Sequence, residues 1–138
     1  MDFELTDEQE LIRDAVGKLC SDYPDEYWSK KDKDHEFPWD FYNDMAKAGW
    51  LGIAIPEAYG GSGQGITEAS IVLETVAASG AAMNGATPLH LSIFGMEPVI
   101  KFGSEEMKHL KSGCGPSSTT SSKFFSKTFI QVCIRCTF

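Results

Sequence analysis

The groups in this 138-residue chain that could do chemistry are a cysteine pair, a histidine and a glycine-rich run. Cys133 and Cys136 have the C-x-x-C spacing of zinc and redox sites, but no second pair accompanies them. His90 has no Asp, Glu or Cys at metal-ligand spacing. Together with Cys20 and Cys114, the cysteines fit a reduced compartment better than a disulfide scaffold. We therefore predict no metal site.

The glycine-rich run, residues 60–65, invites a phosphate-binding interpretation. A dinucleotide fingerprint requires a preceding strand and an acidic residue about 20 positions later, and a phosphate loop requires Gly-Lys-Ser or Gly-Lys-Thr. Neither context is present. We interpret these glycines as residues of backbone turns.

The elements that must position these groups are helical over the first 110 residues. Thr6 and Gln9 have the spacing of a capping box, which predicts a helix that runs toward Pro24. Its apolar stripe is Leu11, Ile12, Ala15, Val16 and Leu19. Residues 29–36 are crowded with charge, which predicts a solvated connection in which His35 is inert.

A second helix is predicted to begin at Pro38 and to end at Gly49. Its expected buried face is Phe41, Tyr42, Met45 and Ala48. The apolar run after Gly49 is too short for another helix and closes at Pro56, so the backbone is expected to turn sharply there.

A third helix is predicted to begin near Thr67, with small and β-branched residues that allow close packing. Residues 82–102 are apolar on more than one face, which predicts a fully enclosed helix. We expect Thr87 to cap a helical piece within this segment and Pro98 to break it before Gly103 stops it.

Four short sequence segments, which we call landmarks, then occur in a fixed order along the chain. They are Leu5-Thr6-Asp7-Glu8-Gln9, Phe37-Pro38, the Pro56-to-Gly61 segment and Phe102-Gly103-Ser104-Glu105-Glu106-Met107-Lys108. Their order resembles that of the amino-terminal helical domain of acyl-CoA dehydrogenases, with its PExYGG and FGxEExK turns. The resemblance covers about residues 3 to 110. It implies an all-α fold, with a helical bundle over residues 1–110. Residues 111–138 have no counterpart in the resemblance, and their low-complexity composition predicts a flexible tail.

The resemblance also implies a substrate site. In that family the matching segment of the helical domain lies beside the fatty-acyl tail, so Thr87, His90, Leu91 and Phe94 are candidate substrate-binding residues. Core packing is the competing interpretation of these side chains, and a satisfied helix histidine is the competing interpretation of His90.

The family's reaction is α,β-dehydrogenation of an acyl-CoA thioester, in which a glutamate removes the α proton and the flavin of FAD accepts hydride. The β domain that covers the flavin and the bundle that carries the base have no match here. Glu57, Glu68, Glu74 and Glu97 are carboxylates outside the motif of that base. We therefore expect no catalytic residue in this chain, FAD in full-length members but not retained here, and no dehydrogenase activity from the chain alone.

Charge changes sharply after residue 110. Residues 1–110 hold all 20 acidic residues and 8 Lys and Arg, whereas residues 111–138 hold 4 Lys and Arg and no acidic residue. Residues 111–122 are a low-complexity run that we predict to be flexible, and Phe124–Phe138 has a strand-like pattern. We hypothesise that an altered reading frame, a retained intron or an alternative end produced this tail.

Composition narrows the classes of partner. The acidity of residues 1–110 argues against a nucleic-acid surface, and no run approaches the roughly 20 apolar residues of a membrane span. The acidic first ten residues are unlike a signal peptide. The resemblance implies acyl-CoA and homologous subunits as partners, and an intracellular location in a mitochondrion, a peroxisome or the bacterial cytoplasm.

Two alternatives to a dehydrogenase domain remain open. One is a helical module that binds acyl chains or a full-length subunit without catalysis. The other is an adaptor for a membrane or a partner, driven by the tail. It would use four apolar side chains beside two lysines: Phe124, Phe125, Phe129, Ile130, Lys123 and Lys127.

Overall fold

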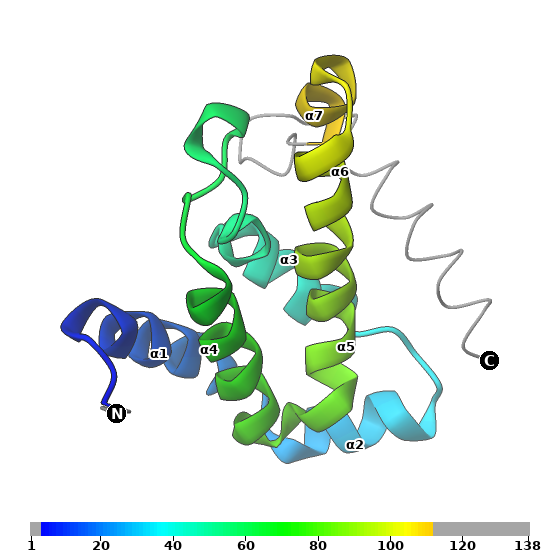
Figure 1. The fold of residues 1–138 in the computed structure, drawn as a ribbon. Helices are drawn as coiled ribbons and strands as arrows, with labels where there is room; N and C mark the ends of the chain where they lie inside the picture. The colour runs from blue at the N-terminus through cyan, green and yellow to red at the C-terminus, as the bar shows by residue number, and fades with distance from the viewer. Residues whose placement is uncertain (1–3, 112–138) are drawn as a thin grey trace.

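The computed structural model describes residues 4–111 (Figure 1). Within this range the chain forms α-helices joined by short turns and contains no strand, which confirms the predicted all-α fold. The helices are α1 (Asp7–Cys20), α2 (Asp25–Lys33), α3 (Trp39–Lys47), α4 (Ile66–Val76), α5 (Ala82–Ile93), α6 (Glu97–Phe102) and α7 (Glu105–Lys111). Four of them, α1, α3, α4 and α5, contribute most of the largest fully buried side chains, and the turn after Gly49 adds Ile53. Those from the helices are Val16, Cys20, Phe41, Met45, Val72, Val76 and Leu89.

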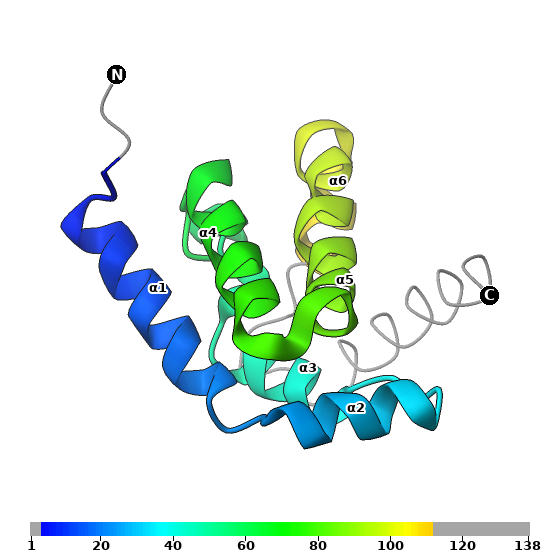
Figure 2. The same cartoon turned by 90° about the horizontal axis from the view of Figure 1, so that it is seen from below.

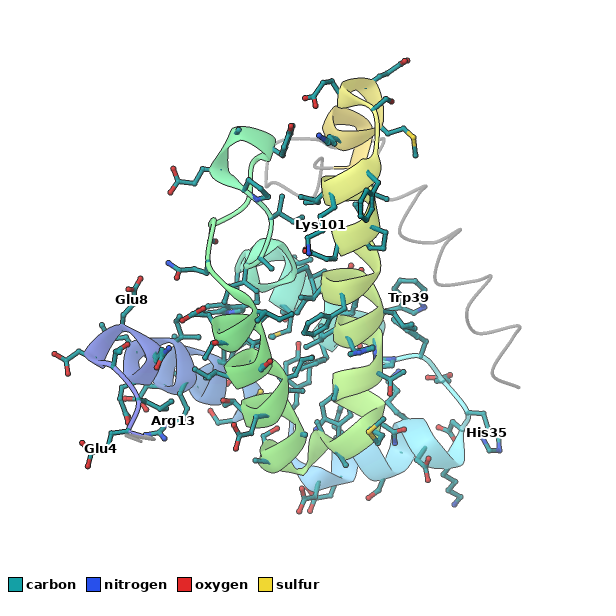
Figure 3. The ribbon with its side chains drawn as sticks, viewed as in Figure 1. Glu4, Glu8, Arg13, His35, Trp39 and Lys101 are labelled. Atoms are coloured by element: carbon teal, nitrogen blue, oxygen red, sulfur yellow. The ribbon has the colours of Figure 1, made fainter. Side chains whose placement is uncertain are left out.

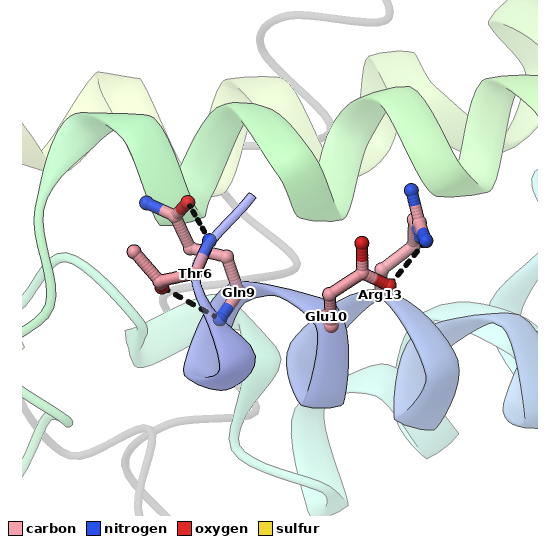
Figure 4. Close-up of polar contacts among 4 residues, drawn as sticks. All are labelled: Thr6, Gln9, Glu10 and Arg13. Atoms are coloured by element: carbon pink, nitrogen blue, oxygen red, sulfur yellow. Dashed lines mark hydrogen bonds and ion pairs between the residues drawn. The ribbon is translucent and has the colours of Figure 1, made fainter. Parts of the chain in front are cut away.

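Helix α1 begins with the predicted capping box (Figure 4). The Gln9 N–H donates to Thr6 Oγ1 at 3.3 Å, and the Thr6 N–H donates to Gln9 Oε1 at 3.1 Å. The two bonds satisfy amide groups that a helix start otherwise leaves unpaired.

The buried face of α1 is narrower than predicted. Ile12, Val16 and Cys20 are buried, whereas Leu11 is 69% exposed and Ala15 also faces solvent. The prediction that Leu11 and Ala15 belong to the core stripe is therefore wrong. The physical reason is that α1 packs mainly against α4, along one side, so the neighbouring row of the helix has no cover.

Helix α2 replaces most of the connection predicted for residues 29–36, and that prediction is wrong as far as Lys33. Trp28 anchors the helix: its side chain is buried, its indole N–H donates to the Tyr23 carbonyl at 3.0 Å, and its ring lies 5.0 Å from that of Phe41. One aromatic anchor thus holds an otherwise charged helix against the core. His35, just beyond it, points away from the helices (Figure 3).

Helix α3 follows Pro38 as predicted and buries Phe41, Tyr42 and Met45, although Ala48 is exposed because the helix has ended at Lys47. Gly49 has the left-handed conformation (φ 87°) expected of a helix stop. The apolar run beyond it is a 3-10 turn over Trp50–Gly52 followed by a further turn and a bend. Leu51, Ile53 and Ile55 are buried in this run.

Helices α4 and α5 run side by side in opposite directions (Figures 1 and 2). Among residues 4–111, the helical run Ile66–Phe102 is long and apolar enough to cross a membrane, by length and composition alone. Gly80 (φ 96°) and Ala82 (φ 44°) interrupt the run. The two helices have 11 and 12 residues, lengths more typical of core helices than of spans, which need about 20.

The prediction of a fully enclosed helix over residues 82–102 is wrong. Met83 is 70% exposed, Phe102 is 86% exposed, and no residue of α6 is buried. The helix also begins at Ala82, so Thr87 is an interior residue and not a cap. Apolar composition predicted burial, but only one side of α5 has helices packed against it. Gly103 ends α6, as expected.

Candidate functional site

The candidate site is a stripe on the outer side of α5. Thr87, His90, Leu91 and Phe94 follow one another at intervals of three, one and three residues. Phe94 begins the 3-10 turn that continues α5 with helical backbone, so all four lie on one face. Thr87, Leu91 and Phe94 are half-buried and His90 is exposed. The His90 and Phe94 ring centroids are 5.1 Å apart. We call these four residues the outer stripe.

Close packing on the inner side of α5 sets the distance between this helix and its neighbours, and so the position of the outer stripe. Leu89 and Ile93 are buried there. At Gly85, an added Cβ would lie 2.6 Å from Ala81 Cβ and 3.2 Å from Trp28 Cη2. Only a glycine lets α5 approach α2 and the α4–α5 turn this closely.

A hydrogen bond between side chains ties α5 to α3. Tyr42 Oη lies 2.8 Å from Ser92 Oγ, and Ser92 Oγ donates its proton to the Pro88 carbonyl at 3.2 Å. Since that proton is used, Tyr42 donates and Ser92 accepts. This bond and the close packing at Gly85 hold the inner side of the helix. The outer stripe lies on the other side, where Phe94 also packs against the core.

The glycine-rich loop does not present a phosphate cradle. Five consecutive amides in it all donate to backbone carbonyls: Gly60 to Glu57, Gly61 to Pro56, Ser62 to Gly52, Gly63 to Ile55 and Gln64 to Ile53. A Cβ at Gly61 would lie 2.1 Å from the Ile55 carbonyl oxygen. The glycines therefore serve turns, as predicted, and also a close backbone approach that the sequence did not reveal.

Two of the sequence landmarks meet in space, a contact that sequence reasoning missed. Tyr59 Oη donates to Glu105 Oε2 at 2.9 Å, and Lys108 Nζ pairs with Glu105 Oε1 at 2.8 Å. Lys108 Nζ also lies 5.7 Å from the Tyr59 ring centroid. The pairing with Glu105 raises the pKa of Lys108. The PExYGG segment thus holds α7 in place across 46 residues of sequence.

Other potentially reactive side chains contribute to packing and to hydrogen bonds within the fold. Burial raises the pKa of the Cys20 thiol, and the Gln9 amide donates to Glu68 at 2.9 Å, which lowers the pKa of that carboxyl. In residues 4–111, no three His, Cys, Asp or Glu side chains lie close enough together to hold a metal ion. Cys114, Cys133 and Cys136 lie outside the described residues, as does the predicted tail beyond Lys111.

Comparison with known proteins places these landmarks in a family. Residues 6–110 match the family described as acyl-CoA dehydrogenase, N-terminal domain. The acyl-CoA dehydrogenase FadE12 of Mycobacterium tuberculosis is 33% identical over 109 residues, which cover 75% of this chain and 26% of that protein. The probable acyl-CoA dehydrogenase YngJ of Bacillus subtilis is 33% identical over 110 residues, 78% of this chain and 28% of the relative.

A third relative carries a different activity in its name. The acryloyl-CoA reductase (NADH) of Anaerotignum propionicum is 31% identical over 108 residues, which cover 78% of this chain and 27% of that protein. No solved structure matches the chain significantly. The chain spans about a quarter of the length of these curated relatives. It belongs to the acyl-CoA dehydrogenase family and contains the N-terminal helical domain of that family.

Proposed function

We propose that this chain is the N-terminal domain of a FAD-dependent acyl-CoA dehydrogenase of fatty-acid catabolism, and that its outer stripe contacts the acyl chain of the substrate. The observation that carries the proposal is the one-sided burial of α5. Leu89 and Ile93 on the inner side of the helix are buried, whereas Leu91 and Phe94 on the outer stripe are only half-buried, and Phe94 also packs against the core, in a domain of this family.

The chemistry of the stripe suits an acyl chain. Leu91 and Phe94 offer apolar surface, and each methylene buried against them contributes up to about 0.8 kcal/mol. Thr87 and His90 border them with groups that can hydrogen-bond at the polar end of the chain. The stripe contains no carboxylate, so its role is to bind and orient the substrate, not to remove a proton.

The described residues do not form a phosphate cradle for FAD. The only glycine-rich loop among residues 4–111 uses its amides from Gly60 to Gln64 within the chain. FAD, when bound to a complete enzyme, would supply the hydride acceptor for the β carbon. We assign no step of that chemistry to this domain and propose that the chain alone neither retains FAD nor turns over substrate.

The direction of the reaction is also left to other parts of the enzyme. Relatives with similar N-terminal domains are named both as acyl-CoA dehydrogenases and as an acryloyl-CoA reductase. A helical domain that binds the acyl chain suits either direction, because substrate and product differ by one double bond.

Binding of acyl-CoA to the purified chain tests the proposal. We expect calorimetry to show that octanoyl-CoA binds more tightly than butyryl-CoA, by up to about fourfold for each methylene that becomes buried. Phe94→Ser should remove this dependence on chain length. Leu11→Ser, which changes an exposed side chain on α1, is the matched control and should retain it. Equal affinities in the unaltered chain would contradict the acyl-chain role.

A dye-reduction assay with the same acyl-CoA series tests for inactivity. We expect a colourless protein without flavin absorbance and without turnover. Turnover that co-purifies with the chain, after an intact homologue has been excluded by mass spectrometry, would refute this part of the proposal.

The alternative is a helical module that binds acyl chains or a subunit without catalysis. The absence of a carboxylate from the outer stripe, together with its half-buried apolar side chains Leu91 and Phe94, favours this alternative over an unrelated enzyme. Co-elution of the chain with a full-length acyl-CoA dehydrogenase in gel filtration, without acyl-CoA binding, would select the subunit-binding form.

A further inference from the structure

The chain contains two asparagines, and one of them, Asn84, precedes a glycine. An asparagine in this position is prone to deamidation, because glycine has no Cβ to hinder attack by its amide nitrogen on the asparagine side chain. Asn84 is exposed and lies in the first turn of α5. The other asparagine, Asn43, is also exposed and helical, but Asp44 follows it. The chain therefore holds a candidate modification site and an internal control for it.

Helical backbone protects an asparagine from this reaction. The Gly85 nitrogen must approach Cγ of Asn84, whereas a helical ψ of about −42° directs that nitrogen along the helix and away from the side chain. Deamidation at Asn84 therefore requires the first turn of α5 to open. Whether it occurs in the folded protein depends on how firmly this turn is held.

Several features favour opening of this turn. Ala82, the first residue of α5, has φ 44°, a conformation that strains a residue with a Cβ. No side chain caps the start of the helix, and Gly85 is a poor helix former. The Asn84 amide donates to Asp32 Oδ1 at 3.4 Å, which is long for a hydrogen bond.

The neighbouring residues confine such an opening. Residues 82–84 are exposed, whereas Ala81 before them and Gly85 after them are buried. The α4–α5 turn that contains Ala81 lies against α2 (Figures 1 and 2), and Leu89 belongs to the core farther along α5. Few buried contacts are lost when residues 82–84 change conformation, so this turn can open while the rest of the domain stays folded.

We infer that Asn84 is a deamidation site that reacts in the folded protein through local opening of the first turn of α5. The Gly85 nitrogen bonds to Cγ of Asn84 and loses its proton, the bond from Cγ to Nδ2 breaks, and ammonia leaves. Water then opens the cyclic imide at either carbonyl, which gives aspartate or isoaspartate. No oxidant or reductant takes part. The inference goes beyond the proposed function and does not depend on it, because it concerns the chain without any ligand.

Both products change the contact between α5 and α2. Each places a second carboxylate near Asp32, in place of the amide that donates to it. Isoaspartate also lengthens the backbone by one methylene next to Gly85, where a Cβ would lie only 3.2 Å from Trp28 Cη2. The reaction therefore alters the start of α5 irreversibly as the protein ages.

Peptide mapping by mass spectrometry tests the inference, after incubation of the full 138-residue chain at neutral pH with and without urea. We expect aspartate and isoaspartate to accumulate at position 84 of the folded chain, and faster there than at position 43. The folded chain should react at most about a hundredfold more slowly than the chain in urea, because a route through global unfolding would slow the reaction by more than about a thousandfold.

Two variants separate local from global opening. Ala82→Gly relieves the strain that favours opening, so the reaction at Asn84 should slow by about threefold to tenfold. Gly17→Ala lies in α1, away from this turn, and it is the matched control. It would slow a reaction that passes through global unfolding by about two- to fivefold, but it should leave a local reaction unchanged. Circular dichroism confirms that both variants are folded.

Three results would overturn the inference. A folded chain that stays intact at Asn84 until the unfolded chain has reacted completely a thousand times over, by extrapolated rate, would show that α5 protects this site fully. Equal slowing by Gly17→Ala and Ala82→Gly would assign the reaction to global unfolding. Equal rates at Asn84 and Asn43 in the folded chain would show that neither Gly85 nor the start of α5 singles out this site.

Discussion

Adding one methyl group at Gly85 and at Gly17 should change stability in opposite directions. Both glycines lie within helices, α5 and α1, so Gly→Ala gains up to about 1 kcal/mol of helix propensity at either position. At Gly17 the new Cβ would meet Thr75 Cγ2 at 3.8 Å, an ordinary contact. We therefore expect Gly17→Ala to stabilise the domain by about 0.5–1 kcal/mol.

At Gly85 packing outweighs propensity. The new Cβ would lie 2.6 Å from Ala81 Cβ and 3.1 Å from Val76 Cγ1. Because an alanine side chain has no rotamer to change, the backbone of α5 must move outward, and overpacking of this kind costs about 1–3 kcal/mol. After the propensity gain, Gly85→Ala should be destabilising by up to about 2 kcal/mol. The gain in helix propensity is the same in both variants, so the difference between their free energies of unfolding measures the steric clash at Gly85.

Thermal unfolding followed by circular dichroism measures this difference. For a domain of this size, 1 kcal/mol shifts Tm by about 4–8 °C, so Gly17→Ala should unfold at a higher temperature than the unaltered chain and Gly85→Ala at a lower one. If Gly85→Ala stabilised the chain as much as Gly17→Ala, the close approach of α5 to α2 and the α4–α5 turn would be refuted.

Three further predictions address the helix start, α7 and acid stability. Thr6→Ala removes the cap of α1 and should cost about 1 kcal/mol in urea unfolding, whereas an unchanged midpoint would show that the capping box adds nothing. Tyr59→Phe removes the hydrogen bond to Glu105, so amide exchange in α7 should accelerate while exchange in α1 stays the same; uniform acceleration would instead indicate global destabilisation. Hydrogen bonds to Asp44 from Lys47 at 2.6 Å and Tyr23 at 2.7 Å lower the pKa of that carboxyl. Because the folded pKa lies below the unfolded value of about 3.9, this contribution is present above pH 4 and is lost as pH falls through the folded pKa. Tyr23→Phe should therefore flatten the fall in stability below pH 4, and a parallel pH profile would contradict the assignment.

Local signals in the sequence predicted local structure well. The capping box at Thr6 and the helix stop at Gly49 depend on residues within a few positions of each other, and both are confirmed. Helix α2 was missed because its charged residues dominate the pattern. Its place in the fold depends on Trp28, whose partner Phe41 comes from another helix.

The sequence did not predict which side of each helix is buried, and this limit also affects the candidate site. Helical spacing places the outer stripe on one face once a helix is assigned, but it does not say which side of α5 has a neighbour. The same limit explains why both Leu11 and Ile12 were assigned to the core, although Leu11 is exposed and Ile12 is buried. The contact between Tyr59 and Glu105 is not local at all, although both residues lie in landmarks that the sequence displayed.

The loop from Gly60 to Gln64 has a consequence for how this domain tolerates change. Glycine-rich surface loops are ordinarily where proteases cut and where insertions accumulate. Here every amide in five successive positions already has an acceptor, so an inserted residue would shift each donor past its carbonyl. Despite its composition, this segment should resist digestion and keep a fixed length across variants of the chain.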